Sequence, residues 1–147
     1  MEYGSIEREI HVDASPEVVF EVVSKPEHIS QWWTDDAKFD STPGATGELI
    51  WGDRTDVVPM TVVSVEPPRL FSFRWCYPEG RLEDSLLVTF ELTPTGTGTT
   101  IRLTETGFRE MGFAEAKVAE QYNDHVSGWD TFVPRLGEYV ARLVSAR

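Results

Sequence analysis

The sequence predicts an α+β domain in which a curled antiparallel sheet encloses one long terminal helix. Apolar side chains recur at helical spacing over residues 113–143, which indicates a helix of about eight turns with one apolar face. Before it, runs of β-branched and aromatic residues are separated by Pro and Gly, as is typical of strands joined by tight turns. A helix with a broad apolar face needs a sheet to pack against, so the two observations together predict this fold class.

The elements before the main run of strands are a strand and two short helices. Apolar and polar residues alternate over Ser5–Val12, which predicts a half-buried strand. Ser15 is a good N-cap, and Pro16 suits the first position of the helix that follows. Pro26 ends this helix and can begin a second short one that runs to Trp32.

We expect residues 34–47 to form a loop, and four or five strands to follow it. Their predicted ranges are 48–51, 57–65, 70–77, 84–93 and 99–106. Alternate side chains on a strand share one face. The predicted inner faces of the last three strands carry Phe71, Phe73, Trp75 and Tyr77, then Leu86, Val88, Phe90 and Leu92, then Ile101 and Leu103.

The long helix contains a proline within its apolar face. Pro134 removes the hydrogen bond to the carbonyl of Asp130, at about 3 kcal/mol in a straight helix. Gly128 and Gly137 each weaken the helix by roughly 0.8–1.0 kcal/mol relative to Ala. We therefore expect a kink or a break between Gly128 and Pro134, which would either wrap the helix round the sheet or gate the mouth of a cavity.

Composition narrows the class of protein. At 147 residues, the chain is expected to form a single domain, residues 1–147. Its one cysteine, Cys76, excludes an internal disulfide framework and fits a reducing compartment.

We find neither a signal peptide nor an apolar run of membrane-spanning length, so we expect a cytoplasmic protein. A formal net charge of −12 repels nucleic acid and anionic membrane surfaces, so neither is expected as a partner.

Five motifs in a fixed order resemble a known family. They are Ala-Ser-Pro-Glu-Val-Val-Phe at 14–20, Pro-Glu-His-Ile-Ser-Gln-Trp-Trp at 26–33, Val-Ser-Val-Glu-Pro-Pro-Arg-Leu at 63–70, Glu-Thr-Gly-Phe at 105–108 and His-Val-Ser-Gly-Trp at 125–129. The chain resembles the helix-grip (START-like, SRPBCC) superfamily and, within it, the family named after the activator of heat-shock protein 90 ATPase. The resemblance implies a deep cavity between sheet and terminal helix, and it suggests a homodimer. It does not imply one activity, because such relatives include lipid binders, polyketide cyclases and a co-chaperone domain.

Two charged residues fall on faces that are otherwise apolar. Glu105 shares the face of Ile101 and Leu103, and Arg8 lies between Ile6 and Ile10. A carboxylate facing a cavity is costly unless it is paired or hydrogen-bonded. Since the first and last strands are neighbours in the resembled fold, one hypothesis is that Arg8 and Glu105 meet in the cavity and orient a ligand. The alternative is that each reaches the rim or pairs elsewhere.

His125 lies one turn before Trp129, where it could act as an acid or base in the cavity or be a hydrogen-bonded residue at the helix edge. The spacing of His11, His28 and His125 does not suggest a metal site, and we expect no cofactor. Trp32, Trp33 and Trp51 are either cavity walls or ordinary core.

We expect a non-enzymatic protein that binds a small apolar, aromatic or lipid-like molecule. The predicted cavity residues are Arg8, Trp32, Trp33, Trp51, Phe71, Phe73, Trp75, Val88, Phe90, Leu103, Glu105, His125, Trp129, Phe132, Val133 and Leu136. One alternative is a cyclase- or hydrolase-like enzyme with Glu105 or His125 as general base. Another is a module that interacts with a chaperone through its surface. An open apolar cavity would favour the non-enzymatic binder. An unpaired Glu105 or His125 inside an open cavity would favour the enzyme, and a sealed interior would favour the chaperone-interacting module.

Overall fold

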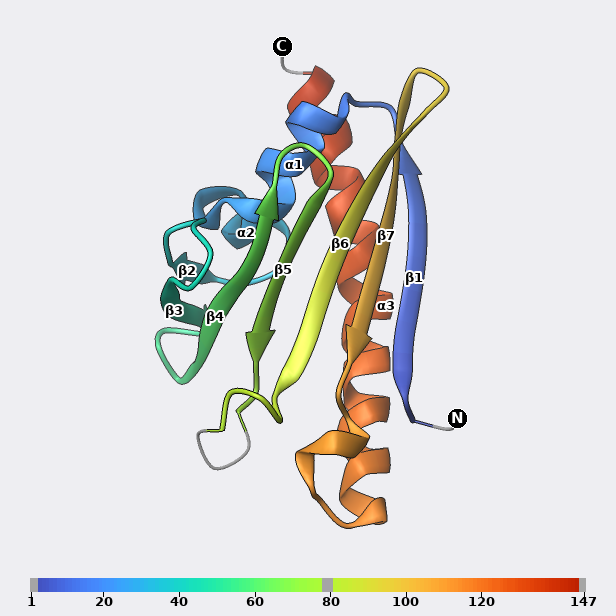
Figure 1. The fold of residues 1–147 in the computed structure, drawn as a ribbon. Helices are drawn as coiled ribbons and strands as arrows, with labels where there is room; N and C mark the ends of the chain where they lie inside the picture. Colours follow the sequence, from blue (N-terminus) through green and yellow to red (C-terminus); the bar gives the residue numbers. More distant parts are fainter. Residues whose placement is uncertain (1–2, 78–80, 146–147) are drawn as a thin grey trace.

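The structure is a computed structural model that describes residues 3–77 and 81–145. Within these residues, a seven-stranded antiparallel sheet has the strand order β1-β7-β6-β5-β4-β3-β2. Three α-helices and a 3-10 turn at Arg109–Met111 complete it (Figure 1). The elements are β1 (Ser5–Val12), α1 (Pro16–Ser24), α2 (Pro26–Trp32), β2 (Asp36–Lys38), β3 (Thr46–Trp51), β4 (Asp56–Glu66), β5 (Leu70–Trp75), β6 (Leu86–Thr95), β7 (Gly98–Thr106) and α3 (Glu115–Ser145).

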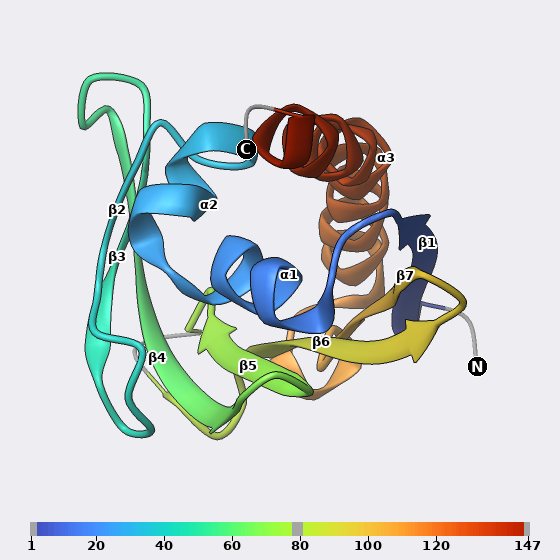
Figure 2. The same cartoon turned by 90° about the horizontal axis from the view of Figure 1, so that it is seen from above.

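The sheet is strongly curved, and the helices occupy its concave side. Figure 2 shows it bending round α1 and α2, while α3 closes the remaining side beside β1. Helix α3 contacts both β1 and α2, so it connects the two ends of the curved sheet. This arrangement confirms the predicted α+β class and the helix-grip fold.

The first two helices begin where the sequence predicts. The Ser15 hydroxyl accepts a hydrogen bond from the Val18 backbone N–H at 3.3 Å, which caps α1, and Pro16 occupies its first turn. Pro26 cannot continue α1 and instead begins α2. Both helices place their apolar side chains in the core, and the Trp32 indole N–H in α2 donates to the Val22 carbonyl at 3.1 Å.

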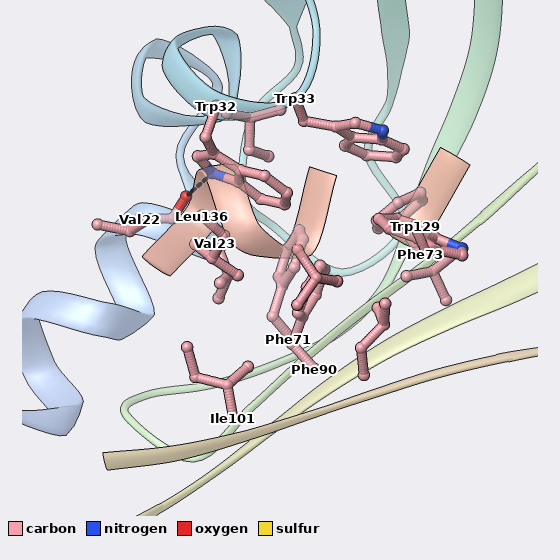
Figure 3. Packing of buried hydrophobic residues seen from close by; sticks show 14 of the residues in the cluster. Val22, Val23, Trp32, Trp33, Phe71, Phe73, Phe90, Ile101, Trp129 and Leu136 are labelled. Carbon is pink, nitrogen blue, oxygen red and sulfur yellow. Dashed lines mark hydrogen bonds between the residues drawn. The ribbon is translucent and has the colours of Figure 1, made fainter. Parts of the chain in front are cut away.

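The core lies between the concave face of the sheet and the helices (Figure 3). The predicted inner faces are confirmed, because their members are buried on β5, β6 and β7, apart from Tyr77. Helix α3 adds Trp129, Val133, Leu136 and Val140 from its apolar face. Full burial of a Leu or Phe side chain contributes about 1.5–3 kcal/mol, so this layer supplies much of the drive to fold.

Two strand predictions need correction. Residues 34–47 are not all loop, because Asp36–Lys38 forms β2 and β3 starts at Thr46. Strand β2 has only three residues, too few for alternation to reveal it, and pairing with β3 defines it. Strand β5 ends at Trp75 rather than at Tyr77. Cys76 adopts a positive φ of 57°, which turns the backbone, so alternation of faces does not extend to Tyr77.

Of the kink or break expected between Gly128 and Pro134, the break is wrong. Helix α3 is continuous from Glu115 to Ser145, with Pro134 inside it. Buried residues on both sides of the proline, Trp129 and Leu136 among them, hold the two halves against the same core. In Figure 2 the two halves nevertheless run in different directions, so the helix axis bends as it follows the sheet. None of the described helices combines the length and hydropathy needed to cross a membrane.

Candidate functional site

A pocket of about 600 Å³ opens beside the N-terminal half of α3. Its other walls come from the end of α2, from the adjoining ends of β3 and β4, and from the end of β5. The lining residues are Trp33, Trp51, Asp56, Val58, Trp75, Cys76, Asp124, His125, Ser127, Gly128, Trp129, Thr131 and Phe132. Small-molecule sites usually fall in the range of roughly 300–1,000 Å³, so this pocket has the size of a ligand site.

Four tryptophans form the apolar wall of the pocket. The Trp33 ring lies at the centre, with ring centroids 5.1 Å from Trp75, 5.1 Å from Trp129 and 5.6 Å from Trp51. Trp51 and Trp75 lie 6.0 Å apart. These separations are those of favourable aromatic pairs, so the rings support one another and form a preformed aromatic wall.

A buried carboxylate holds two of these tryptophans. Glu105 on β7 is 0% exposed. It accepts hydrogen bonds from the Trp75 indole N–H at 2.8 Å and from the Trp129 indole N–H at 2.9 Å. His125 Nδ1 lies 2.9 Å from the same oxygen that Trp129 contacts. An indole nitrogen can only donate, so Glu105 acts as an acceptor that joins β5, β7 and α3.

His125 is fixed between this carboxylate and aromatic rings. Its ring lies 5.4 Å from Trp75 and meets Phe108 edge-on at 5.5 Å. The side chain is 13% exposed, and the residue borders the pocket. When Nδ1 donates its proton to Glu105, Nε2 retains the lone pair. The imidazole is therefore oriented as a base would be, by a carboxylate behind it.

Cys76 also borders the pocket, at the turn that ends β5. Burial raises the pKa of its thiol, and the negative charges of Glu105 and Asp56 raise that pKa further. The thiolate is the reactive form of cysteine, so this shift disfavours Cys76 as a nucleophile at neutral pH. Within the described residues, no group of three or more His, Cys, Asp or Glu side chains could hold a metal ion.

The predicted cavity residues fall into two groups and two single cases. Those that border the pocket are Trp33, Trp51, Trp75, His125, Trp129 and Phe132. Those that do not border it and pack in or against the core are Trp32, Phe71, Phe73, Val88, Phe90, Leu103, Val133 and Leu136. Glu105 lies behind the pocket wall, and Arg8 lies outside. Contact of any of them with a ligand stays a prediction.

The hypothesis that Arg8 meets Glu105 is wrong. Opposite Glu105 on β1 lies Ile6, whereas Arg8 pairs in register with Leu103. The Arg8 guanidinium instead bonds Asp130 of α3 at 2.9 Å, with its side chain 32% exposed. Because β1 is an edge strand, a long side chain can pass the edge of the sheet and keep its charge at the surface.

Sequence reasoning missed the polar part of the pocket. Asp124, Ser127 and Thr131 lie on α3 at spacings of three and four residues, so they follow one line along the helix. Helical periodicity could have found them, because they flank His125. Asp56 and Cys76 carried no such signal, since their positions depend on where β4 begins and on the turn after β5.

Solved structures share the fold over nearly the whole chain. Protein MLL2253 from Mesorhizobium loti superposes with a TM-score of 0.79 at 25% identity, covering 94% of this chain and 97% of its own. CalU16 from Micromonospora echinospora gives 0.68 at 21% identity, covering 99% and 83%. The Aha1 dimer from Colwellia psychrerythraea gives 0.70 at 18% identity, covering 92% and 95%. No curated protein matches the sequence.

The family is established by sequence. The family model described as "Activator of Hsp90 ATPase homolog 1-like protein" matches residues 13–141, which include every element from α1 to β7 and most of α3. Family and fold together support a helix-grip domain. The chain belongs to the Activator of Hsp90 ATPase homolog 1-like protein family, as the five motifs implied.

Proposed function

We propose that this domain binds a small hydrophobic molecule with a planar aromatic part, without chemical change, in the pocket beside α3. The observation that carries the proposal is the open pocket of about 600 Å³ walled by Trp33, Trp51, Trp75 and Trp129. A chaperone-interacting module would function with a sealed interior, so the open pocket favours the binder.

The free-energy gain on binding comes from burial and from preorganisation. Apolar area removed from water contributes about 25 cal/mol per Å². Glu105 fixes the indole N–H groups of Trp75 and Trp129, so these rings need little ordering when a guest arrives. The site then resembles a rigid slot rather than a surface that forms around its ligand.

The test uses N-phenyl-1-naphthylamine, a neutral aromatic probe whose fluorescence rises in apolar pockets. Gly128 borders the pocket, and a Cβ there would meet nothing within 4 Å. We expect Gly128→Leu to occupy the pocket and weaken probe binding at least about tenfold, while Gly128→Ala has little effect. Both variants replace a glycine inside a helix, which stabilises the helix by about 1 kcal/mol. Neither variant should therefore unfold the protein. Unchanged affinity in Gly128→Leu would place the probe elsewhere and contradict the proposal.

A second candidate is a cyclase- or hydrolase-like enzyme with His125 as general base. The contact between His125 Nδ1 and Glu105 at 2.9 Å favours it. Glu105 itself is fully buried behind three donors, so in this candidate it positions His125 rather than acting as the base. We would expect slow hydrolysis of 2-naphthyl acetate that His125→Gln abolishes while probe binding persists. If the wild-type protein shows no turnover above background, the enzyme is excluded and the binder is the one remaining candidate.

The predicted homodimer is part of the same proposal. The Aha1 of Colwellia psychrerythraea was solved as a dimer. Light scattering of this protein during size-exclusion chromatography measures its mass directly, and a value near that of one chain, 16.6 kDa, contradicts the dimer.

A further inference from the structure

We propose that the pocket selects a guest whose aromatic part carries a positive charge, with the ring inside and the cation at the mouth between Asp56 and Asp124. This inference rests on the proposed function, since it assigns the chemical class of the ligand in the same pocket. It follows from three features of the lining: where the acids lie, what field they produce, and which charges are missing.

The acids and the aromatic rings lie at different depths. Trp33, Trp75 and Trp129 are 5%, 7% and 3% exposed, whereas Asp56 and Asp124 are both exposed. Asp56 is the first residue of β4, and Asp124 belongs to α3, so the two carboxylates come from different walls of the pocket. A guest that buries its ring against the tryptophans therefore presents its outer end to two carboxylates.

The thiol of Cys76 reports the electrostatic field at the wall. Besides burial, the charges of Glu105 and Asp56 raise the pKa of this thiol, which means that an anion is disfavoured there. Burial disfavours either charge, but the two carboxylates specifically disfavour an anionic ligand and favour a cation. Tryptophan is the aromatic side chain with the strongest cation–π attraction, so the wall and the rim act in the same direction.

No described residue that lines the pocket is Lys or Arg. The arginines near the lining have contacts of their own. Arg54 pairs with Glu48 at 3.5 Å, and Arg135 lies over the Phe132 ring at 5.3 Å. The net charge of −12 adds a long-range attraction for cations approaching the protein.

Two ligands of matched shape and one anion on the same ring system separate charge from hydrophobicity. They are (naphthalen-2-ylmethyl)trimethylammonium, its neutral carbon isostere 2-(2,2-dimethylpropyl)naphthalene, and anionic 2-naphthylacetate. Each is titrated against bound N-phenyl-1-naphthylamine at low ionic strength, and its affinity is read from the displacement of the probe. We expect the cation to bind about fivefold or more tighter than the neutral isostere, and the anion to bind most weakly.

Paired variants locate the effect at the rim. Asp56→Asn with Asp124→Asn should reduce the affinity of the cation toward that of the neutral isostere and leave the neutral ligand unchanged. Glu91→Gln with Glu138→Gln removes two charges from exposed positions outside the pocket and should preserve the selectivity. Equal losses in the two double variants, or equal binding of cation and isostere by the wild-type protein, would overturn the inference and leave the hydrophobic binder standing. Failure of the probe and of all three ligands to bind would overturn the proposed function as well.

Discussion

Glu105→Gln is the sharpest test of the network behind the pocket wall. The carboxylate receives three donors at 2.8–2.9 Å in a fully buried position. An amide has one acceptor oxygen, which can replace the oxygen shared by Trp129 and His125. Its NH₂ group then faces the Trp75 indole N–H, so two donors oppose each other. Turning the amide round does not remove the conflict, because its NH₂ group then faces the Trp129 indole N–H.

The expected size of the effect follows from this count. A hydrogen bond to a charged group contributes about 1.5–3 kcal/mol, and a buried unsatisfied donor costs about 1–3 kcal/mol. We therefore expect Glu105→Gln to lower the free energy of unfolding by about 2–4 kcal/mol, most of it from the Trp75 contact. For a domain of this size, each kcal/mol lowers the midpoint of thermal unfolding by roughly 2–4 °C.

A double-mutant cycle isolates the contact. Trp75→Phe removes the opposing N–H, so the penalty of Glu105→Gln should be smaller in that background, with a coupling energy of about 1–3 kcal/mol. Urea unfolding followed by far-ultraviolet circular dichroism measures all four proteins without relying on tryptophan emission. Glu91→Gln, on the exposed face of β6, is the control and should stay within about 0.5 kcal/mol of wild type. A similarly small effect of Glu105→Gln, or zero coupling to Trp75, would refute the reasoning.

Three further predictions concern separate contacts. Burial raises the pKa of the Cys76 thiol, so the contribution of Cys76 to stability should be constant below the ordinary thiol pKa of about 8.5 and fall above it, as the unfolded chain ionises first. Cys76→Ala should flatten this decline in urea titrations at alkaline pH, and an unchanged slope would contradict its origin. His28 Nδ1 lies 2.7 Å from the Tyr139 hydroxyl, so Tyr139→Phe should lower the free energy of unfolding by about 0.5–1.5 kcal/mol in urea; no loss would mean that this contact between α2 and α3 is not stabilising. Pro134→Ala restores a hydrogen bond to the Asp130 carbonyl and should raise the thermal midpoint by the equivalent of about 1–3 kcal/mol, whereas a lower midpoint would mean that the bend is needed for packing.

Local signals predicted most of the fold. Ser15 and Pro16 define the start of α1 through a cap and a fixed φ, both of which are properties of adjacent residues. Alternation placed Phe71 and Phe73 on the concave face, and Glu105 with them, because the period of a strand is two. Strand β2 escaped prediction because its three residues are defined by pairing with β3 rather than by their own pattern.

The candidate site was less predictable because it depends on how elements pack together. Alternation predicts that Glu105 faces inward, but the position of α3 decides that Trp129 and His125 reach it while Arg8 does not. The break expected at Pro134 failed for a related reason, since packing on both sides of the proline outweighs its local penalty. Likewise, the left-handed turn at Cys76 depends on a single backbone angle.

The place of β1 at the edge of the sheet has a consequence for synthesis on the ribosome. Among the described strands its one partner is β7, whose first residue, Gly98, follows Val12 by most of the length of the domain. At about 5–20 residues per second, β1 therefore waits on the order of 10 s for that partner. Strands β2 to β6 can pair one after another as they appear, but β1 joins the sheet only after β7, and helix α3 emerges later still. A nascent chain arrested before Gly98 exposes the pairing edge of β6, which is a template for aggregation and a recognition site for holding chaperones.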